Sequence, residues 1–198
     1  MLSSIHPFGE RSRRNSFRFT ATAHIAGSTL GGIGLGALAG LVGVALLSMF
    51  SPSDTVRSTA VLLATFAAFG IEATGKVQLL PSRSRQVDEN WIQRYRGWVY
   101  GAGWGVELGF GISTIITTAL VHLLVVTMIF VGSFPAAIVL GATFGFVRGA
   151  TILTTARVDS PERLRSFHRN LDGLAARSRS SVILALFVAT VFGVGSLL

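Results

Sequence analysis

The stretch GAGWGVELGFGISTIITTALVHLLVVTMIFV, residues 101–131, decides the fold class of this chain. It holds one acidic residue, Glu107, and one histidine, His122. A helix needs roughly 20 apolar residues to cross the hydrocarbon core of a bilayer, so this segment is long enough to span a membrane. Ionisable groups inside such spans are costly and often functional. The stretch therefore predicts an integral membrane protein and directs attention to its polar residues.

The composition of the whole chain supports this prediction. Half of the 198 residues are hydrophobic and only 13% are charged, whereas ordinary globular domains carry about 25% charged residues. The chain has no cysteine, which excludes disulfides, thiolate metal sites and thiol redox chemistry. No cofactor and no metal site are expected.

The formal net charge of +8 is distributed unevenly along the chain. Fifteen of the seventeen basic residues lie in three segments, 1–23, 73–100 and 157–179, which alternate with apolar segments. This is the pattern of basic loops on the cytoplasmic side of a membrane protein. Nucleic-acid binding is not needed to explain the charge.

We expect an all-α, polytopic integral membrane protein of about five transmembrane helices, in the cytoplasmic (inner) membrane of a bacterium. The amino terminus would lie inside and the carboxy terminus outside, with amphipathic helices in the cytoplasm. The expected segments are a basic cytoplasmic arm at 1–23, transmembrane helices 1 and 2 at 24–75, a cytoplasmic interfacial loop or helix at 76–100, transmembrane helices 3 and 4 at 101–156, a cytoplasmic amphipathic helix at 157–179, and transmembrane helix 5 at 180–198.

Two sets of glycines recur at a spacing of four residues. Small residues at this spacing share one face of a helix and allow two backbones to approach closely. We therefore expect helix packing at Gly32, Gly36, Gly40, Gly101, Gly105 and Gly109.

Polar residues in 101–131 would form a narrow stripe if the segment were one helix. Glu107, Gly111, Thr114, Thr118 and His122 fall within roughly an 80° arc at 100° per residue. The functional interpretation is a path for a small solute or ion, with the glutamate and the histidine as titrating groups. The structural interpretation is that the threonines bond to their own helix and the two titratable groups pair with neighbours.

Arg148 lies in the next predicted span at a similar depth. An unpaired charge there costs at least ~2.5 kcal/mol, so we expect an ion pair between Arg148 and Glu107, serving either the path or the packing of the bundle. Glu72 and Lys76, four residues apart at the inner end of the second span, are expected to form a solvated interfacial pair.

The sequence lacks the patterns of known catalytic sites. It has no HExxH, GxSxG or P-loop motif, and its four histidines are far apart. We therefore expect a protein that is not an enzyme and has no catalytic residues.

The segments YGAGWGVELGFGISTII and LGATFGFVRGATIL, within about residues 100–155, resemble part of the CcdA/DsbD-type transmembrane domains. That resemblance implies broken helices around a central cavity and a thiol–disulfide relay. The family's Pro-Cys pair would fall on Ile112 and Ser113. Because this chain has no cysteine, it would be a relative that has lost the redox chemistry.

Two functions fit these features. The first is a transporter-like protein that passes a small solute or ion along Glu107, Thr114, Thr118 and His122, with Arg148 as the counter-charge. The alternative is a non-catalytic membrane subunit or assembly factor that docks a partner complex through glycine-rich helix faces and the helix at 160–179. The expected partners are the lipid membrane and either further copies of the chain or another membrane protein.

Overall fold

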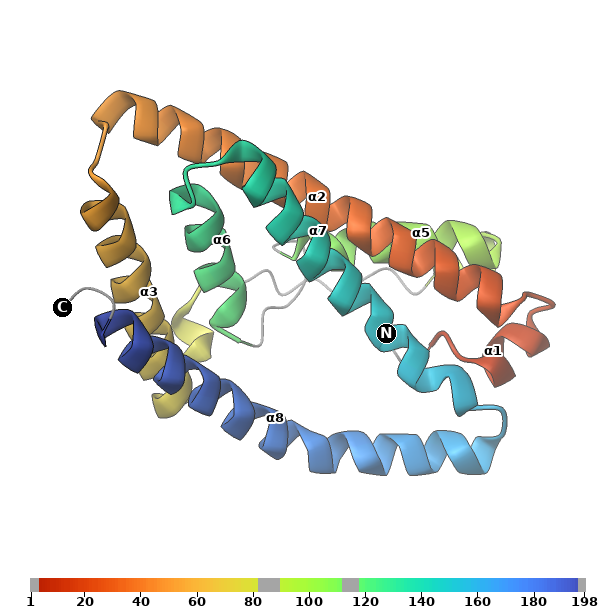
Figure 1. Cartoon of the computed structure of the whole chain (residues 1–198). Helices are drawn as coiled ribbons and strands as arrows, with labels where there is room; N and C mark the ends of the chain where they lie inside the picture. The colour runs from red at the N-terminus through yellow and green to blue at the C-terminus, as the bar shows by residue number, and fades with distance from the viewer. Residues whose placement is uncertain (1–3, 82–89, 112–117, 196–198) are drawn as a thin grey trace.

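The computed structural model describes residues 4–81, 90–111 and 118–195, and in these ranges all regular structure is helical. The predicted all-α class is confirmed for this part of the chain. The elements in chain order are α1 (Pro7–Ser12), α2 (Phe17–Phe50), α3 (Asp54–Thr74), η1 (Val77–Leu79), α4 (Trp91–Arg94), α5 (Gly97–Phe110), α6 (Leu120–Phe130), α7 (Phe134–Ala150), η2 (Thr151–Arg157) and α8 (Pro161–Gly195) (Figure 1).

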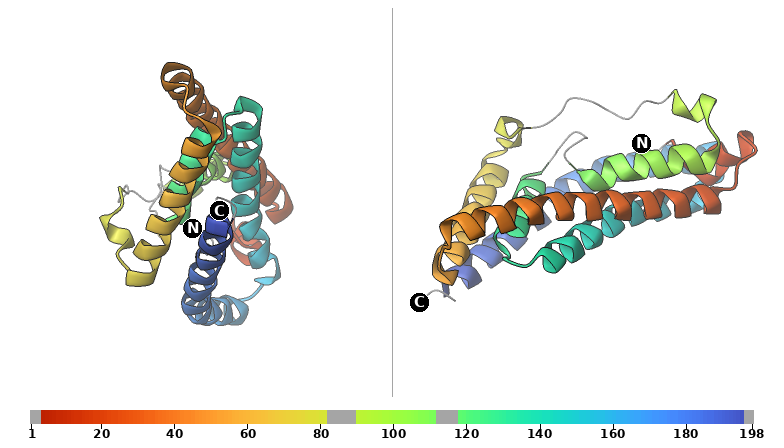
Figure 2. Two further views of the ribbon diagram at one scale, coloured as in Figure 1. Left: turned by 60° about the vertical axis from the view of Figure 1, so that its left-hand side comes forward. Right: turned by 90° about the horizontal axis from the view of Figure 1, so that it is seen from above.

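Helix α2 is the centre of the fold. Its 34 residues make it about 51 Å long, and it begins at residue 17 rather than at the predicted 24. Figure 2 shows α5 beside one side of it and α7 beside the other. Gly27 lies against Ala102 and Gly31 against Val106, so α2 and α5 run in parallel. Helix α7 runs antiparallel to α2.

Glycine brings these three helices into backbone contact. A Cβ atom at Gly32 would overlap the carbonyl oxygen of Gly141, and one at Gly109 would overlap that of Ser28. The six glycines singled out by their spacing all face another helix of the same chain: Gly32, Gly36 and Gly40 face α7, and Gly101, Gly105 and Gly109 face α2.

The segment 101–131 is not one helix, and this prediction was wrong. Helix α5 ends at Phe110, and Gly111 adopts φ +70°, a left-handed conformation that interrupts the helical ladder. Residues 112–117 lie outside the described part of the chain, and the next described helix, α6, begins at Leu120. Helix α6 lies along the carboxy-terminal half of α2, where Met128 packs with Leu35.

Four helices are long and apolar enough to cross a membrane: Phe17–Phe50, Asp54–Thr74, Phe134–Arg157 and Arg177–Val194. Helices α5 and α6 are each too short to span the bilayer alone. The structure therefore agrees with the predicted helical membrane protein. In place of the predicted third span it has two shorter helices, α5 and α6, which both pack on α2.

The segments near the two ends of the chain also differ from the predictions. Residues 4–16, in the predicted basic cytoplasmic arm, are packed on the bundle, because α1 contacts α2 and η2 and Glu10 accepts a hydrogen bond from Tyr100 of α5. Most of the predicted helix at 157–179 and the described part of the predicted span at 180–198 belong to one continuous helix, α8 (Pro161–Gly195), because no proline or glycine interrupts residues 174–192. Leu186 and Phe187, in its second half, pack against Ala68 and Phe69 of α3.

Candidate functional site

A buried carboxylate lies at the start of α6, beyond the point where α5 ends. Glu72, on α3, is only 4% exposed. Its Oε1 accepts a hydrogen bond from the Thr118 hydroxyl and another from the Ala119 backbone N–H, both at 2.6 Å. The first N–H groups of a helix have no partner within the helix, so the carboxylate of Glu72 completes the amino terminus of α6. The predicted solvated pair of Glu72 with Lys76 is wrong.

A half-open cavity of about 600 Å³ lies beside this carboxylate. Its polar lining comes from Glu72, Thr118, Ser178 and Arg179, and its apolar lining includes Val182. The guanidinium of Arg179 donates to the backbone carbonyl of Glu72 at 3.0 Å. The cavity wall thus carries one acidic and one basic group, and each of them also bonds to the backbone at a helix end.

Arg148 has the same kind of role at the end of α5. Its Nη1 donates to the carbonyl oxygen of Leu108 at 3.0 Å, and its guanidinium lies over the Phe144 ring, 5.5 Å from the centroid. The ion pairs among the described residues do not include the predicted pair of Arg148 with Glu107. The arginine reaches the carbonyl of the residue next to Glu107 instead.

The predicted polar stripe is divided by the break. Glu107 lies exposed on α5, Thr118 precedes α6, and His122 lies on α6 with its Nε2 3.0 Å from the carbonyl oxygen of Pro81. Thr114 lies outside the described residues. Because the helix is interrupted at Gly111, these residues do not share one helix face.

A common pattern emerges from the charged side chains of the bundle. Arg57 donates to the carbonyl of Phe130 at the end of α6, at 3.2 Å, as Arg148 does at the end of α5 and Arg179 does at the end of α3. A backbone group left unpaired in hydrocarbon costs several kcal/mol. These charges therefore stabilise helix ends inside the bundle.

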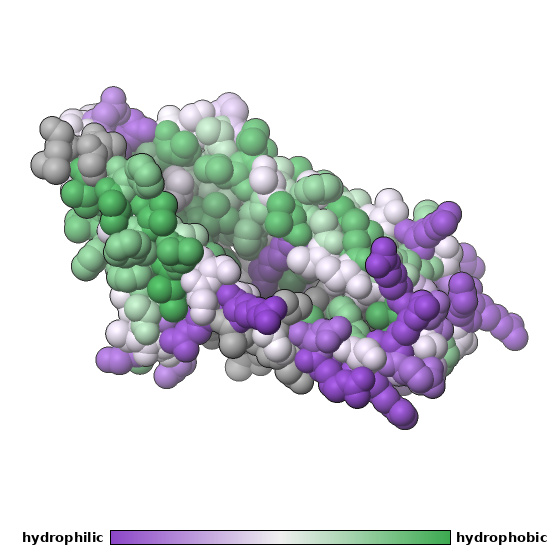
Figure 3. Space-filling model, turned by 60° about the horizontal axis from the view of Figure 1, so that its bottom comes forward, coloured by the Kyte–Doolittle hydropathy of each residue, from purple (hydrophilic) through white to green (hydrophobic). Residues whose placement is uncertain are grey.

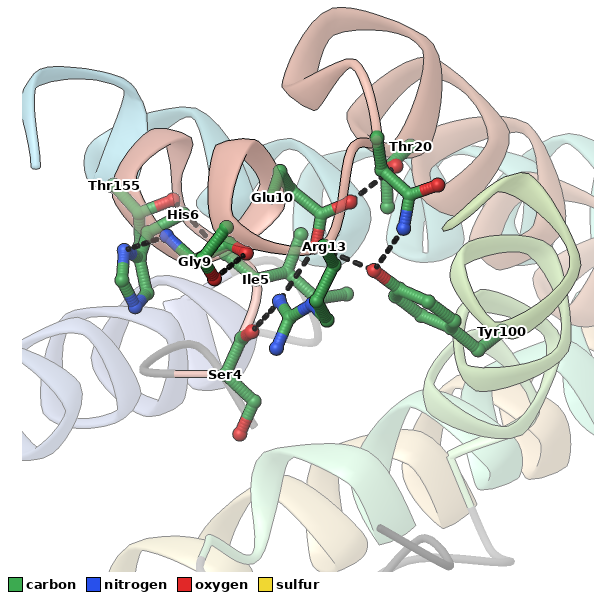
Figure 4. A network of polar contacts seen from close by, with 11 residues as sticks. Ser4, Ile5, His6, Gly9, Glu10, Arg13, Thr20, Tyr100 and Thr155 are labelled. Atoms are coloured by element: carbon green, nitrogen blue, oxygen red, sulfur yellow. Dashed lines mark hydrogen bonds and ion pairs between the residues drawn. The ribbon is translucent and has the colours of Figure 1, made fainter. Parts of the chain in front are cut away.

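A second carboxylate, Glu10 of α1, is fully buried at the end of the molecule where α1 lies. Figure 4 shows the polar contacts around it. It accepts hydrogen bonds from the Tyr100 hydroxyl at 2.5 Å, the Thr20 hydroxyl at 2.8 Å and Arg13 Nη2 at 2.7 Å. These partners belong to α5, α2 and the end of α1. The cluster around Glu10 therefore fastens the amino-terminal segment to the core of the bundle.

His6 closes the other side of this segment. Its Nδ1 accepts a hydrogen bond from the Gly9 N–H at 3.1 Å and so caps α1, while Thr155 donates to the Ile5 carbonyl at 2.9 Å. Burial, with a smaller contribution from the positive charge of Arg13, lowers the pKa of His6 below its usual value of 6.5.

Sequence reasoning missed this cluster. The pair His6-Pro7 could have indicated that a helix begins at residue 7, since proline is favoured at the first position of a helix. Across the described ranges, no three histidine, aspartate or glutamate side chains converge as metal ligands would.

Comparison with known proteins finds three similar bacterial proteins, each named "Methylamine utilization protein MauF". The one from Paracoccus denitrificans is 28% identical over 170 residues, which are 84% of this chain and 60% of the relative. Those from Paracoccus versutus and Methylobacillus flagellatus are 30% and 29% identical over 74% of the chain, and 54% and 52% of their own lengths. The chain thus spans about half to three fifths of these relatives. No family model and no solved structure matches.

These comparisons correct two predictions. The chain is similar to MauF proteins over most of its length, so the resemblance to CcdA/DsbD-type domains was wrong. The transporter function was also wrong, because the relatives are named for methylamine utilization and not for transport. The alternative of a membrane subunit or assembly factor agrees better with these names.

Proposed function

We propose that this chain is a non-catalytic membrane accessory protein of bacterial methylamine utilization, which assists the assembly or maintenance of a partner complex. The observation that carries the proposal is the similarity to MauF over 84% of the chain. The structure supports it because the charged side chains of the bundle stabilise helix ends instead of forming a continuous polar stripe.

The proposal includes a location and a topology. The chain lies in the cytoplasmic membrane with its amino terminus inside and its carboxy terminus outside. It crosses the membrane five times. Four crossings are made by α2, α3, α7 and α8, and the remaining one is shared by α5 and α6, which pack on successive parts of α2. The basic residues near α1, α4 and the start of α8 then all lie on the inner side, as expected for a bacterial membrane protein.

The partner would dock on the first half of α8 and not on the glycine faces. The glycine-rich faces of α2, α5 and α7 are covered by helices of the same chain, which rules out the docking role predicted for them. The described contacts of α8 with α3 lie in its second half, between Arg179 and Gly193, and include Leu186 and Phe187. Figure 1 shows the first half of α8 running along the opposite edge of the molecule from α2.

The surface of this first half suits a protein partner at the inner side of the membrane. Leu164, Phe167 and Leu171 recur at helical spacing and are only half-buried, and Arg165 and Arg169 beside them are exposed. An apolar stripe flanked by arginines is typical of a helix that lies in a groove of another protein.

Site-specific photo-crosslinking tests the proposal. A photoreactive phenylalanine analogue replaces Phe167 in the first half of α8, or Phe192, which is 75% exposed near the end of the same helix. In cells grown on methylamine, we expect a discrete protein adduct at position 167 and none at position 192. Adducts at neither position, or equal adducts at both, would contradict the proposed docking face.

A further inference from the structure

A second cavity, of about 350 Å³, opens at the inner end of the molecule. It lies between α1, the first turn of α2 and the end of η2. Its polar lining includes Arg11, Asn15, Arg18 and Asp159, and Phe17 contributes an apolar wall. Figure 3 shows hydrophilic side chains gathered at the end of the molecule where α1 and the start of α8 lie.

The lining is positively charged. Asp159 pairs with Arg163 at 2.9 Å, so its charge is compensated. Arg11 and Arg18, in contrast, are exposed and take no part in the side-chain hydrogen bonds or ion pairs found within the described ranges. Two guanidinium groups that face one cavity without a protein partner favour an anionic ligand with several acceptor oxygens.

Two polar residues between α1 and α2 also line the cavity. Asn15 is one of them, although its side-chain amide donates to the Tyr100 hydroxyl at 3.4 Å. Ser16, the residue before α2, makes no side-chain hydrogen bond to the helix start. The first N–H groups of α2 therefore lack a cap and add to the attraction for an anion, although the two arginines contribute most.

The place of the cavity at one end of α2 favours a membrane lipid as the source of the anion. Helix α2 is about 51 Å long, roughly 20 Å more than the hydrocarbon core of a bilayer. With the apolar part of α2 inside the core, its first turn lies outside it, on the side of the lipid headgroups. Phe19, one residue after Arg18, is 62% exposed and suits contact with the acyl region.

We propose that this cavity binds the phosphate group of an anionic phospholipid from the inner leaflet, with Arg11 and Arg18 as the charged contacts. The inference goes beyond the proposed function and does not depend on it. Bound lipid would brace α1 against the start of α2, next to the cluster around Glu10.

Native mass spectrometry of the purified full chain in mild detergent tests the inference. The probes are phosphatidylglycerol and phosphatidylcholine with the same acyl chains. We expect stable binding of phosphatidylglycerol and little binding of phosphatidylcholine. Replacing both arginines (R11Q with R18Q) should weaken phosphatidylglycerol binding roughly 25-fold, at about fivefold for each basic charge.

The matched control removes two exposed arginines from α8, R165Q with R169Q, and should change the affinity by less than about twofold, since screening confines such effects to nearby charges. A second pair, R11K with R18K, keeps the charge and should keep most of the binding. If the glutamine variant does not fold, the lysine variant still shows whether lipid binding depends on the positive charges at positions 11 and 18. Equal binding of the two lipids, or an equal loss in the α8 control, would overturn the proposal.

A competition with inorganic phosphate distinguishes a phospholipid headgroup from free phosphate as the ligand of this cavity. An excess of inorganic phosphate should leave the lipid bound. Binding of phosphate alone that depends on Arg11 and Arg18, without selective lipid binding, would overturn the assignment to a phospholipid.

Discussion

Replacing Gly32 with alanine should destabilise the fold at the crossing of α2 and α7. A Cβ atom there would overlap the carbonyl oxygen of Gly141 and would lie 2.9 Å from the Cα and N atoms of Gly145. All of these are backbone atoms, so no side chain can rotate away. The two helices would have to separate by roughly 1 Å or more to restore ordinary contact with the Gly141 oxygen. Overpacking of this kind costs about 1–3 kcal/mol.

Gly70 provides a matched control on α3, because a Cβ atom there would have nothing within 4 Å. Its replacement by alanine should raise stability by up to about 1 kcal/mol through helix propensity. The assay is reversible unfolding of purified protein in mixed micelles, followed by circular dichroism and tryptophan fluorescence. We expect the two variants to differ by about 1–4 kcal/mol. A difference below about 0.5 kcal/mol would refute the close packing of α2 on α7.

The same unfolding assay checks three further predictions. Glu72→Leu should cost about 1–3 kcal/mol because it leaves the Ala119 N–H without its acceptor, whereas Glu72→Gln keeps an acceptor and should cost less; equal losses would contradict the capping role. Arg148→Met should cost a similar ~1–3 kcal/mol by freeing the Leu108 carbonyl, and unchanged stability would contradict that bond. Because the pKa of His6 is lowered in the folded state, its contribution to stability is complete above its unfolded value of 6.5 and is lost as the pH falls below it. Stability should therefore decrease between about pH 7 and about pH 5, and His6→Asn should flatten this decrease; identical pH profiles would contradict the burial of His6.

The helix break at Gly111 shows what an apolar sequence conceals. Hydropathy reports that a segment prefers lipid, but not whether its helix is continuous, and 101–131 is apolar on both sides of the break. Glycine both packs helices and interrupts them. Gly109 lies in the contact with α2, whereas Gly111, two residues later, adopts a positive φ. The distinction depends on the tertiary contacts of Glu72 and Arg148, which lie on other helices.

Periodicity identified which glycines face another helix but not which helix they face. The spacing of Gly32 and Gly36 indicated one packed face on α2, yet their partners on α7 lie about a hundred residues further along the chain. For the same reason, the sequence did not show whether a glycine-rich face was free to dock another protein. In the structure, the glycine-rich faces of α2, α5 and α7 are covered by helices of the same chain.

Charged segments were the other source of error. The arginines at 11–14 favoured a basic cytoplasmic arm, but Glu10 just before them is fully buried and holds this segment against Tyr100 and Thr20. A local surplus of basic charge does not reveal that one acidic residue has its partners on distant helices.

Deletion of the gene in its own bacterium, followed by growth on methylamine, tests the proposed function most directly. The proposal predicts that the deletion strain fails to grow with methylamine as the sole nitrogen source and grows normally with ammonium. Full growth should return with the intact chain, and also with Glu107→Gln, because that residue is not assigned to the docking face. Normal growth of the deletion strain on methylamine would contradict the proposal.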